Sequence, residues 1–236
     1  MEIADPHRSL ESDPWLAALP SDTRAALLGA ARMRAVDNGV AIYRAGDPGD
    51  GLHAVLKGEV RLIGHSEAGR RLVYLILRQG DWFGEMSVLD GRPRLHDAIA
   101  FGSSVILHVD SSRIDAITAV HPRFDRAIGA LTCQHQRAAL AFVEQTLTAS
   151  TEARLAFILT EMAGRHGRRV ETGVEIDLRL SQEDLAALVG VSRQSLAALL
   201  GRLRRERVVE TRYARLVVLD LAALQQKCGR SQPWTV

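Results

Sequence analysis

The sequence has 236 residues, of which 47% are hydrophobic and 25% charged, a composition that excludes a disordered chain and suits one large or two modest domains. Its two cysteines, Cys133 and Cys228, exclude a disulfide framework, a four-cysteine zinc site and a four-thiolate iron–sulfur cluster. The net charge of +2 is unevenly distributed along the chain. Residues 1–150 carry 16 basic and 18 acidic side chains, whereas residues 151–236 carry 14 basic and 10 acidic side chains. The positive excess in the second part favours a polyanionic partner there.

No apolar run approaches the roughly 18 residues that a membrane-spanning helix needs. The acidic first residues lack the apolar stretch of a secretory signal peptide. We therefore expect a cytoplasmic protein in a reducing environment.

The N-terminal half is predicted to begin with a helix and to continue as a β-domain. Residues 15–35 have apolar side chains at helical spacing, with Ser21 or Asp22 as the N-cap. From Val36 to Val109, turns that contain glycine and aspartate separate short apolar runs. These runs predict strands at 40–43, 52–56, 59–63, 72–77, 98–101 and 105–109. Short strands in regular succession are typical of an antiparallel barrel or jelly roll.

A long helix with two apolar faces is predicted from Pro122 to about Ala149. One face carries Phe124, Ile128, Leu131, Ala138 and Phe142, and the other carries Leu140, Val143 and Leu147. A helix that is apolar on two sides needs two neighbours. One face can cover the β-domain, and we expect the other to form a seam with a second subunit. The alternative is a helix enclosed within one subunit.

A small second domain is predicted after Ser150, and it contains a helix-turn-helix. Its expected elements are a helix at 152–164, a strand-like segment at 174–180, helices at 182–189 and 193–206, and a hairpin of 208–211 with 215–220. Ala186 is small where the second helix of the motif crosses the first. Gly190 suits the left-handed residue that ends the first helix, and Ser192 can cap the second.

The apolar positions of the motif complete the pattern, and they are Leu185, Val189, Val191 and Leu199. An ordinary αα-hairpin lacks this combination of a small residue, a glycine and a cap at fixed offsets. We therefore predict a DNA-binding motif whose second helix enters the major groove.

The outward face of the second helix lies opposite a row of leucines and defines the predicted DNA-contacting residues. These are Ser192, Arg193, Gln194, Ser195, Ala198, Arg202 and Arg205. Gln194 can pair with adenine through two hydrogen bonds, Arg193 can reach a guanine edge, and Ala198 offers only a methyl contact. Phosphates are expected to meet Arg202, Arg204, Arg205, Arg207, Arg212 and Arg215.

A second candidate site lies in residues 80–98 of the β-domain. Gly84 and Glu85 open a short helical turn, and Arg94 follows Glu85 nine residues later. Backbone N–H groups and a guanidinium suit a phosphate, and a carboxylate can accept a hydrogen bond from a ribose hydroxyl. We predict that a phosphorylated ribose is bound by Gly84, Glu85, Met86, Ser87, Arg94 and Leu95. The alternative is a structural ion pair between Glu85 and Arg94.

These motifs resemble the Crp/Fnr family of bacterial transcription regulators over about 15–221. The resemblance rests on the segments 42–48, 55–60, 80–86, 93–94 and 180–203. It implies an α+β fold with a cyclic-nucleotide-binding β-roll at 15–121, a dimerisation helix at 122–149 and a winged helix-turn-helix at 150–223. It also implies that Gly84 and Glu85 face the ribose and that Arg94 faces the cyclic phosphate of the ligand.

The resemblance further implies the partners and the regulation. A homodimer would bind a pseudo-palindromic site in double-stranded DNA and contact RNA polymerase, with cAMP or another cyclic nucleotide as effector. Several positions depart from the family pattern. The residues expected to meet adenine fall near Ala139 and Leu140, whose side chains cannot form hydrogen bonds. Leu95 stands where cAMP binders have a serine or threonine that meets the phosphate, and Ala198 replaces a long basic residue of the recognition helix.

Other functions stay open as alternatives. An effector-independent regulator and a nucleotide-sensing module that acts on a protein partner are two of them. A cupin-type metalloenzyme is considered because jelly rolls often carry metal sites of histidine and glutamate. A haem sensor is considered because His53, His65, His96 and His108 lie in the β-region. The predicted strands carry no His-x-His pair with a following glutamate, and no Ser/His/Asp or Cys/His arrangement is recognisable in the sequence. We therefore predict no metal site and no catalytic residue, and we expect structural roles for these histidines.

Overall fold

The computed structural model describes residues 10, 13–65, 71–176, 181–212 and 215–228. It divides into two compact units, Met1–Gln136 and Arg137–Val236. None of the described helices is both long enough and apolar enough to span a membrane.

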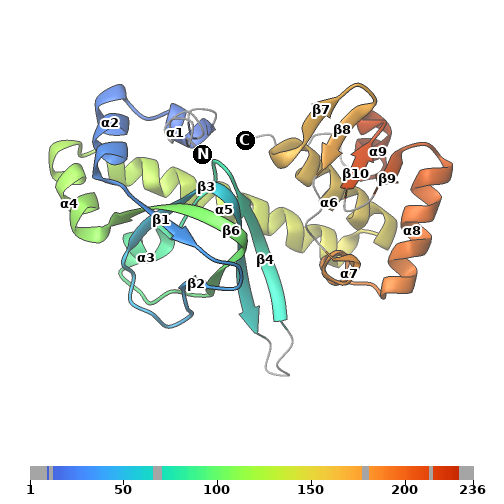
Figure 1. Cartoon of the computed structure of the whole chain (residues 1–236), viewed down its shortest axis with the longest axis horizontal. Coiled ribbons are helices and arrows are strands. Elements are labelled where there is room, and N and C mark those ends of the chain that lie inside the picture. The colour runs from blue at the N-terminus through green and yellow to red at the C-terminus, as the bar shows by residue number, and fades with distance from the viewer. Residues whose placement is uncertain (1–9, 11–12, 66–70, 177–180, 213–214, 229–236) are drawn as a thin grey trace. The chain divides into compact units, whose positions relative to one another are not determined.

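The first unit is an antiparallel β-roll with helices at its ends (Figure 1). Its strands are β1 (Arg32–Val36), β2 (Ala41–Tyr43), β3 (Gly51–His65), β4 (Arg71–Arg78), β5 (Trp82–Phe83) and β6 (Asp97–Asp110). Its helices are α1 (Pro14–Ala17), α2 (Ser21–Ala30), α3 (Glu85–Asp90) and α4 (Ser111–Val120). The sheet order is β1-β6-β3-β4, with β2 paired to β6 and β5 paired to β3.

The predicted helix over residues 15–35 is wrong in its extent. The chain forms two helices around Pro20, and Arg32–Val36 becomes strand β1 because it pairs with β6, in a register that sets Arg32 opposite His108. The predicted N-cap is also wrong, since Pro20 occupies that position of α2 without a side-chain cap.

Two pairs of predicted strands are each one continuous strand in the structure. The segments 52–56 and 59–63 lie within β3, and the segments 98–101 and 105–109 lie within β6. Gly58, predicted as part of a turn, has φ 91° and lies where the pairing of β3 with β6 shifts register. A Cβ there would lie 2.3 Å from Ser104 Oγ, so the glycine allows a bulge in place of a turn.

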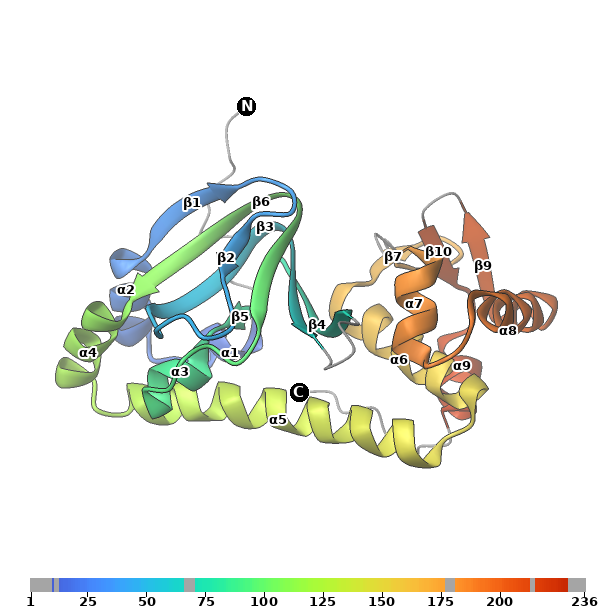
Figure 2. The ribbon, with the colours of Figure 1, turned by 90° about the horizontal axis from the view of Figure 1, so that it is seen from below.

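Helix α5 (Phe124–Thr148) crosses the boundary between the two units and continues without a break (Figure 2). Phe124, Ile128 and Leu131 are buried in the core of the first unit, as their spacing predicts. Further along, the predicted face is wrong, because Ala141 and Gln145 are buried whereas Phe142 is exposed. Leu140, Val143 and Leu147, which form the second predicted face, are exposed.

The second unit has a core of helices beside a small sheet (Figure 1). Its elements are α6 (Thr151–His166), β7 (Arg168–Val170), β8 (Gly173–Ile176), α7 (Gln182–Val189), α8 (Arg193–Arg205), β9 (Val209–Arg212), β10 (Arg215–Val218) and α9 (Leu221–Lys227). The strands form an antiparallel sheet in the order β7-β8-β10-β9. The predicted hairpin is confirmed as β9 and β10, whereas residues 177–180 of the predicted strand lie outside the described residues.

Candidate functional site

Arg94 is the centre of the predicted ribose-phosphate site, and it is a buried cation. Its side chain is 2% exposed. The guanidinium donates hydrogen bonds to the carbonyl oxygens of Gly84 and Gly51, each at 2.7 Å, and to Asp50 Oδ1 at 2.5 Å. It also lies 4.3 Å from the ring centre of Tyr43. We call this group of residues, together with Glu85, the Arg94 cradle.

Asp50 supplies the counter-charge of Arg94. Partial burial acts to raise the pKa of Asp50, but its hydrogen bond with Arg94 and the positive charge of its neighbours outweigh burial, so its pKa lies below the ordinary value. The carboxylate is therefore ionised at neutral pH. An anionic ligand that binds Arg94 has to compete with this carboxylate for the guanidinium.

Gly84 and Glu85 lie beside Arg94, as the sequence predicts. Gly84 has φ 90°, and a Cβ on it would lie 2.7 Å from Arg94 Nη1, so only glycine fits between the turn and the guanidinium. Glu85 is 5% exposed and accepts a hydrogen bond from His135 Nδ1 of α5 at 2.9 Å. The predicted alternative of a Glu85–Arg94 ion pair is replaced by two separate pairs, Arg94 with Asp50 and Glu85 with His135.

The other predicted ligand residues have different surroundings. Ser87 is buried, and its Cβ would lie 2.7 Å from a Cβ added to Gly49. Met86 and Leu95 are 44% and 72% exposed, so neither is enclosed by the protein. The structure thus brings Gly84, Glu85 and Arg94 together and leaves Met86 and Leu95 at the surface.

Sequence reasoning missed Asp50 and His135 as members of the cradle. Asp50 lies in a segment that the sequence marks as a turn, and its pairing with Arg94 joins residues 44 positions apart. His135 is 50 positions from Glu85 and carries no local signal within its helix. Only the approach of α5 to α3 brings that pair together.

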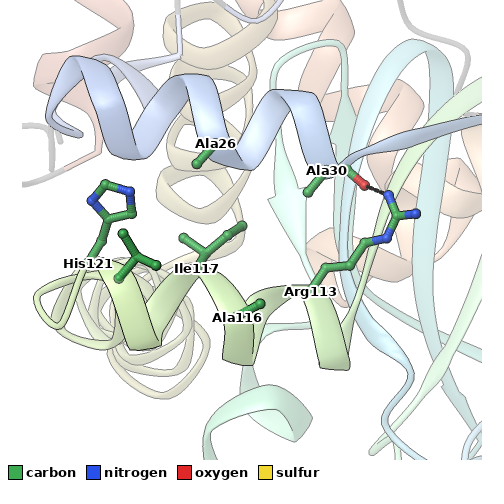
Figure 3. Close-up of a pocket in the computed structure, with 7 residues that line it drawn as sticks. Ala26, Ala30, Arg113, Ala116, Ile117 and His121 are labelled. Atoms are coloured by element: carbon green, nitrogen blue, oxygen red, sulfur yellow. Dashed lines mark hydrogen bonds between the residues drawn. The ribbon is translucent and has the colours of Figure 1, made fainter.

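A cavity of about 340 Å³ lies between α2 and α4 and is separate from the cradle (Figure 3). Its walls are mostly apolar and come from Ala26, Ala30, Ala116, Ile117 and Val120. Arg113 donates a hydrogen bond to the carbonyl oxygen of Ala30 at one end of this cavity (Figure 3). Ligand sites generally place several polar groups so that they converge on one molecule. This cavity lacks that feature among its described residues.

The helix-turn-helix of the second unit has the local geometry that its sequence predicts. Ser181 Oγ accepts from Asp184 N at 3.0 Å at the start of α7, and Gly190 ends that helix with φ 74°. Ser192 Oγ accepts from Ser195 N at 3.1 Å at the start of α8. The buried side chains of α8 are Leu196, Leu199, Leu200 and Leu203, the predicted row.

The opposite face of α8 and its N-cap are exposed, and together they hold the seven residues predicted as the DNA-contacting face. Ser192, Arg193, Gln194, Ser195, Ala198, Arg202 and Arg205 are all exposed. Arg202 bonds to Glu152 at 2.7 Å and Arg193 Nε donates to Gln182 at 3.3 Å. Among the described residues, the side chains of Gln194 and Arg205 have no hydrogen-bond or ion-pair partner.

Of the arginines expected to meet phosphate beyond this face, two have protein partners. Arg204 donates to Thr211 Oγ1 at 3.1 Å, and Arg215 bonds to Glu175 at 3.2 Å. Nothing is described of the side chain of Arg212. The Arg215–Glu175 contact is an exposed ion pair, and such pairs contribute about 0–1 kcal/mol, so a phosphate can replace the carboxylate of Glu175 at modest cost.

Comparison with known proteins assigns both units. Residues 33–121 match the cyclic nucleotide-binding domain family, and residues 153–227 match the Crp-like helix-turn-helix domain family. The global nitrogen regulator of Synechocystis sp. is 25% identical over 193 residues, which cover 81% of this chain and 86% of that protein. A CRP-like cAMP-activated global transcriptional regulator of Mycobacterium tuberculosis is 25% identical over 67% of this chain and 70% of its own length.

Solved structures agree with this assignment. A CRP-family transcriptional regulator from Thermus thermophilus aligns with a TM-score of 0.67 and 26% identity, covering 84% of this chain and 97% of that chain. In this chain the match to a cyclic nucleotide-binding domain is followed by the match to a Crp-like helix-turn-helix, in the order that the family resemblance implies. The chain therefore belongs to the Crp/Fnr family of transcription regulators.

Proposed function

We propose that this regulator acts as a homodimer, that α8 reads the DNA sequence and that an effector in the Arg94 cradle modulates DNA binding. The DNA-reading role rests on one observation, the exposed face of α8. Its base-reading candidates project from the first turn of a helix whose other face is packed by four leucines. In this motif the N-terminal residues of the second helix meet base edges.

The residues of α8 have distinct proposed roles. Gln194 supplies two hydrogen bonds to an adenine, Arg193 approaches a guanine after it leaves Gln182, and Ala198 contacts a thymine methyl group. Ser192, Ser195, Arg202 and Arg205 position the helix on phosphates. A homodimer would then bind half-sites about 10 bp apart on one face of the duplex. RNA polymerase is the protein partner that the family resemblance implies.

The DNA-reading role is tested by comparing Gln194→Ala with Arg205→Ala. We expect Gln194→Ala to lose about 1–3 kcal/mol of discrimination per half-site between specific and random DNA. Arg205→Ala should weaken binding to both DNAs alike and reduce the salt dependence of affinity, because it removes a phosphate contact. Arg32→Ala, an exposed arginine of β1, is the charge-matched control and should change neither. Equal losses on both DNAs for Gln194→Ala would contradict the proposal.

The effector is proposed to be a cyclic nucleotide whose phosphate displaces Asp50 from Arg94 and whose ribose competes with His135 for Glu85. Arg94 would keep an anionic partner throughout this exchange, because the phosphate takes the place of the Asp50 carboxylate. Leu95 offers no hydroxyl to the phosphate, so the affinity should fall below that of a site with a serine or threonine there.

A thermal-shift screen of cyclic nucleotides tests this proposal. A ligand at 100 times its Kd stabilises the protein by about 2.7 kcal/mol. The shift should disappear in Arg94→Gln and persist in Arg92→Ala, which changes an exposed arginine two residues away. A shift that persists in Arg94→Gln would place the ligand elsewhere.

The second candidate is an effector-independent regulator. It is favoured by the fact that Arg94 and Glu85 already have side-chain partners within the protein. DNA binding that no cyclic nucleotide changes, together with the absence of any thermal shift, would support this candidate over the first.

A further inference from the structure

Three potential metal ligands lie together at one end of the β-roll. His53 of β3 and His108 of β6 are direct cross-strand partners, so their side chains share one face of the sheet. Their rings are nearly parallel, with centres 4.5 Å apart and planes 14° apart. Asp50 precedes β3, and its Oδ2 lies 3.9 Å from His53 Nε2 and 3.6 Å from His108 Nε2.

Within the described part of the chain, His53 lacks hydrogen-bond partners although it is buried. Its side chain is 3% exposed, and Nδ1 has no partner among the described residues. Nε2 points toward Asp50 Oδ2, beyond hydrogen-bond distance. An unsatisfied buried polar group costs about 1–3 kcal/mol. The unsatisfied atom is Nδ1, whereas Nε2, the other ring nitrogen, is the atom that faces Asp50 and is open to a ligand there.

The neighbours of the three side chains resemble the outer shell of a metal site. Arg94 binds Oδ1 of Asp50 and leaves Oδ2 directed at the two imidazoles. Asp110 Oδ1 lies 3.7 Å from His108 Nδ1, on the far side of that ring from Asp50. Metal-bound histidines generally donate their second N–H to a carboxylate or carbonyl, and metal-bound carboxylates are themselves hydrogen-bonded.

We propose that Asp50, His53 and His108 form a binding site for a divalent first-row transition metal, with His53 Nε2, His108 Nε2 and Asp50 Oδ2 as ligands. The ion would replace the hydrogen bond, 3.2 Å long, between His108 Nε2 and the backbone carbonyl oxygen of Asp50. These three residues each offer a ligand atom within 4.8 Å of the others. Two imidazoles and one carboxylate suit Zn²⁺ or Fe²⁺ and leave at least one coordination position for water. Asp50 and His108 are 49% and 25% exposed, which gives the ion a route from solvent.

This inference goes beyond the DNA-binding proposal and does not depend on it. It also revises the prediction of no metal site. That prediction looked for histidines close together in the sequence, whereas strand pairing brings His53 and His108 together. The Asp50 carboxylate would lie between the metal ion and Arg94, so it would link the metal site to the cradle.

Binding of Zn²⁺ alone to the full-length protein tests the proposal. Competition with a chromophoric chelator should give one Zn²⁺ per chain. His108→Gln and Asp50→Asn should each weaken that binding at least tenfold, since even outer-shell changes cost about 10–100-fold in metal affinity. The control His65→Ala removes an exposed histidine at the end of the same strand and should bind as the unaltered protein does.

A measurement on the unaltered protein covers the case in which a variant fails to fold. Zn²⁺ should move the Nε2 resonances of two histidines in a ¹H–¹⁵N spectrum and leave the others in place. The proposal is overturned if Zn²⁺ does not bind stoichiometrically, if both variants bind it as tightly as the unaltered protein, or if no histidine Nε2 resonance moves.

Discussion

Glu85 is a buried carboxylate whose charge is stabilised by a residue from a distant element. Burial acts to raise its pKa, but the hydrogen bond and charge of His135 outweigh burial, so the pKa lies below the ordinary value of 4.5. A carboxyl group with a lowered pKa in the folded state stabilises the fold above its unfolded pKa. That contribution is lost as the pH falls through the folded pKa, because the unfolded chain takes up the proton first.

His135→Ala should therefore destabilise the protein in a pH-dependent way. At pH 7 the loss should be about 1–3 kcal/mol, since a buried carboxylate is left without its donor. The difference from the unaltered protein should shrink as the pH falls below 4.5, because first the unfolded chain and then the folded protein takes up a proton at Glu85. Urea unfolding from pH 7 to pH 3 measures this, with Gln136→Ala, an exposed neighbour on α5, as the control. A difference that is constant over this range would contradict the assigned role of the Glu85–His135 pair.

At the scale of elements, the turn between α7 and α8 depends on the left-handed backbone of Gly190. A residue with a Cβ costs roughly 1–2 kcal/mol in that conformation. At Gly190 the added Cβ would also lie 3.2 Å from Arg154 Nη1. Gly201 is the opposite case, because it lies inside α8 and an added Cβ would meet nothing closer than 3.7 Å.

We expect Gly190→Ala to lower the free energy of unfolding by about 1–2 kcal/mol. Gly201→Ala should raise it by about 0.5–1 kcal/mol, because alanine favours a helix interior over glycine. Both can be measured by urea unfolding under one set of conditions. If the two variants are equally stable, the turn does not need a left-handed residue.

At the scale of the whole molecule, the exposed apolar face of α5 bears on assembly. Leu140, Val143 and Leu147 are 58%, 49% and 78% exposed on one helix. Contiguous exposed apolar surface of this kind marks interaction sites. The proposed homodimer would cover it with the same face of a second chain, in the manner of a coiled coil.

Replacing these three residues together by glutamine should raise the dimer dissociation constant at least 100-fold. Each buried aliphatic side chain contributes about 1.5–3 kcal/mol, and 1.4 kcal/mol is a factor of ten. Sedimentation velocity over a concentration series measures the change. Val120→Gln, which alters a 73% exposed residue of α4, should leave the association unchanged. A triple variant that stays dimeric would exclude this face as the seam.

Much of the second unit could be predicted from short-range patterns. The bounds of α7 and α8 agree with the predicted 182–189 and 193–206 to within one residue. The caps at Ser181 and Ser192 act over three residues, and the row of leucines on α8 repeats with the helix period. Such interactions lie within one or two helical turns, so they can be predicted without knowledge of the tertiary structure.

The sequence by itself therefore determined the recognition helix and the nearness of Gly84, Glu85 and Arg94, since these depend on local spacing. The family and the α+β fold followed from the resemblance of its motifs to the Crp/Fnr family. The tertiary structure decided strand β1, the continuity of β3 and β6, and the partners of the buried charges. Asp50 meets Arg94 and His135 meets Glu85 across long stretches of chain, and strand pairing stacks the ring of His53 on that of His108. A buried charge must find a counter-charge wherever the fold provides one, and that choice depends on packing rather than on neighbours in the sequence.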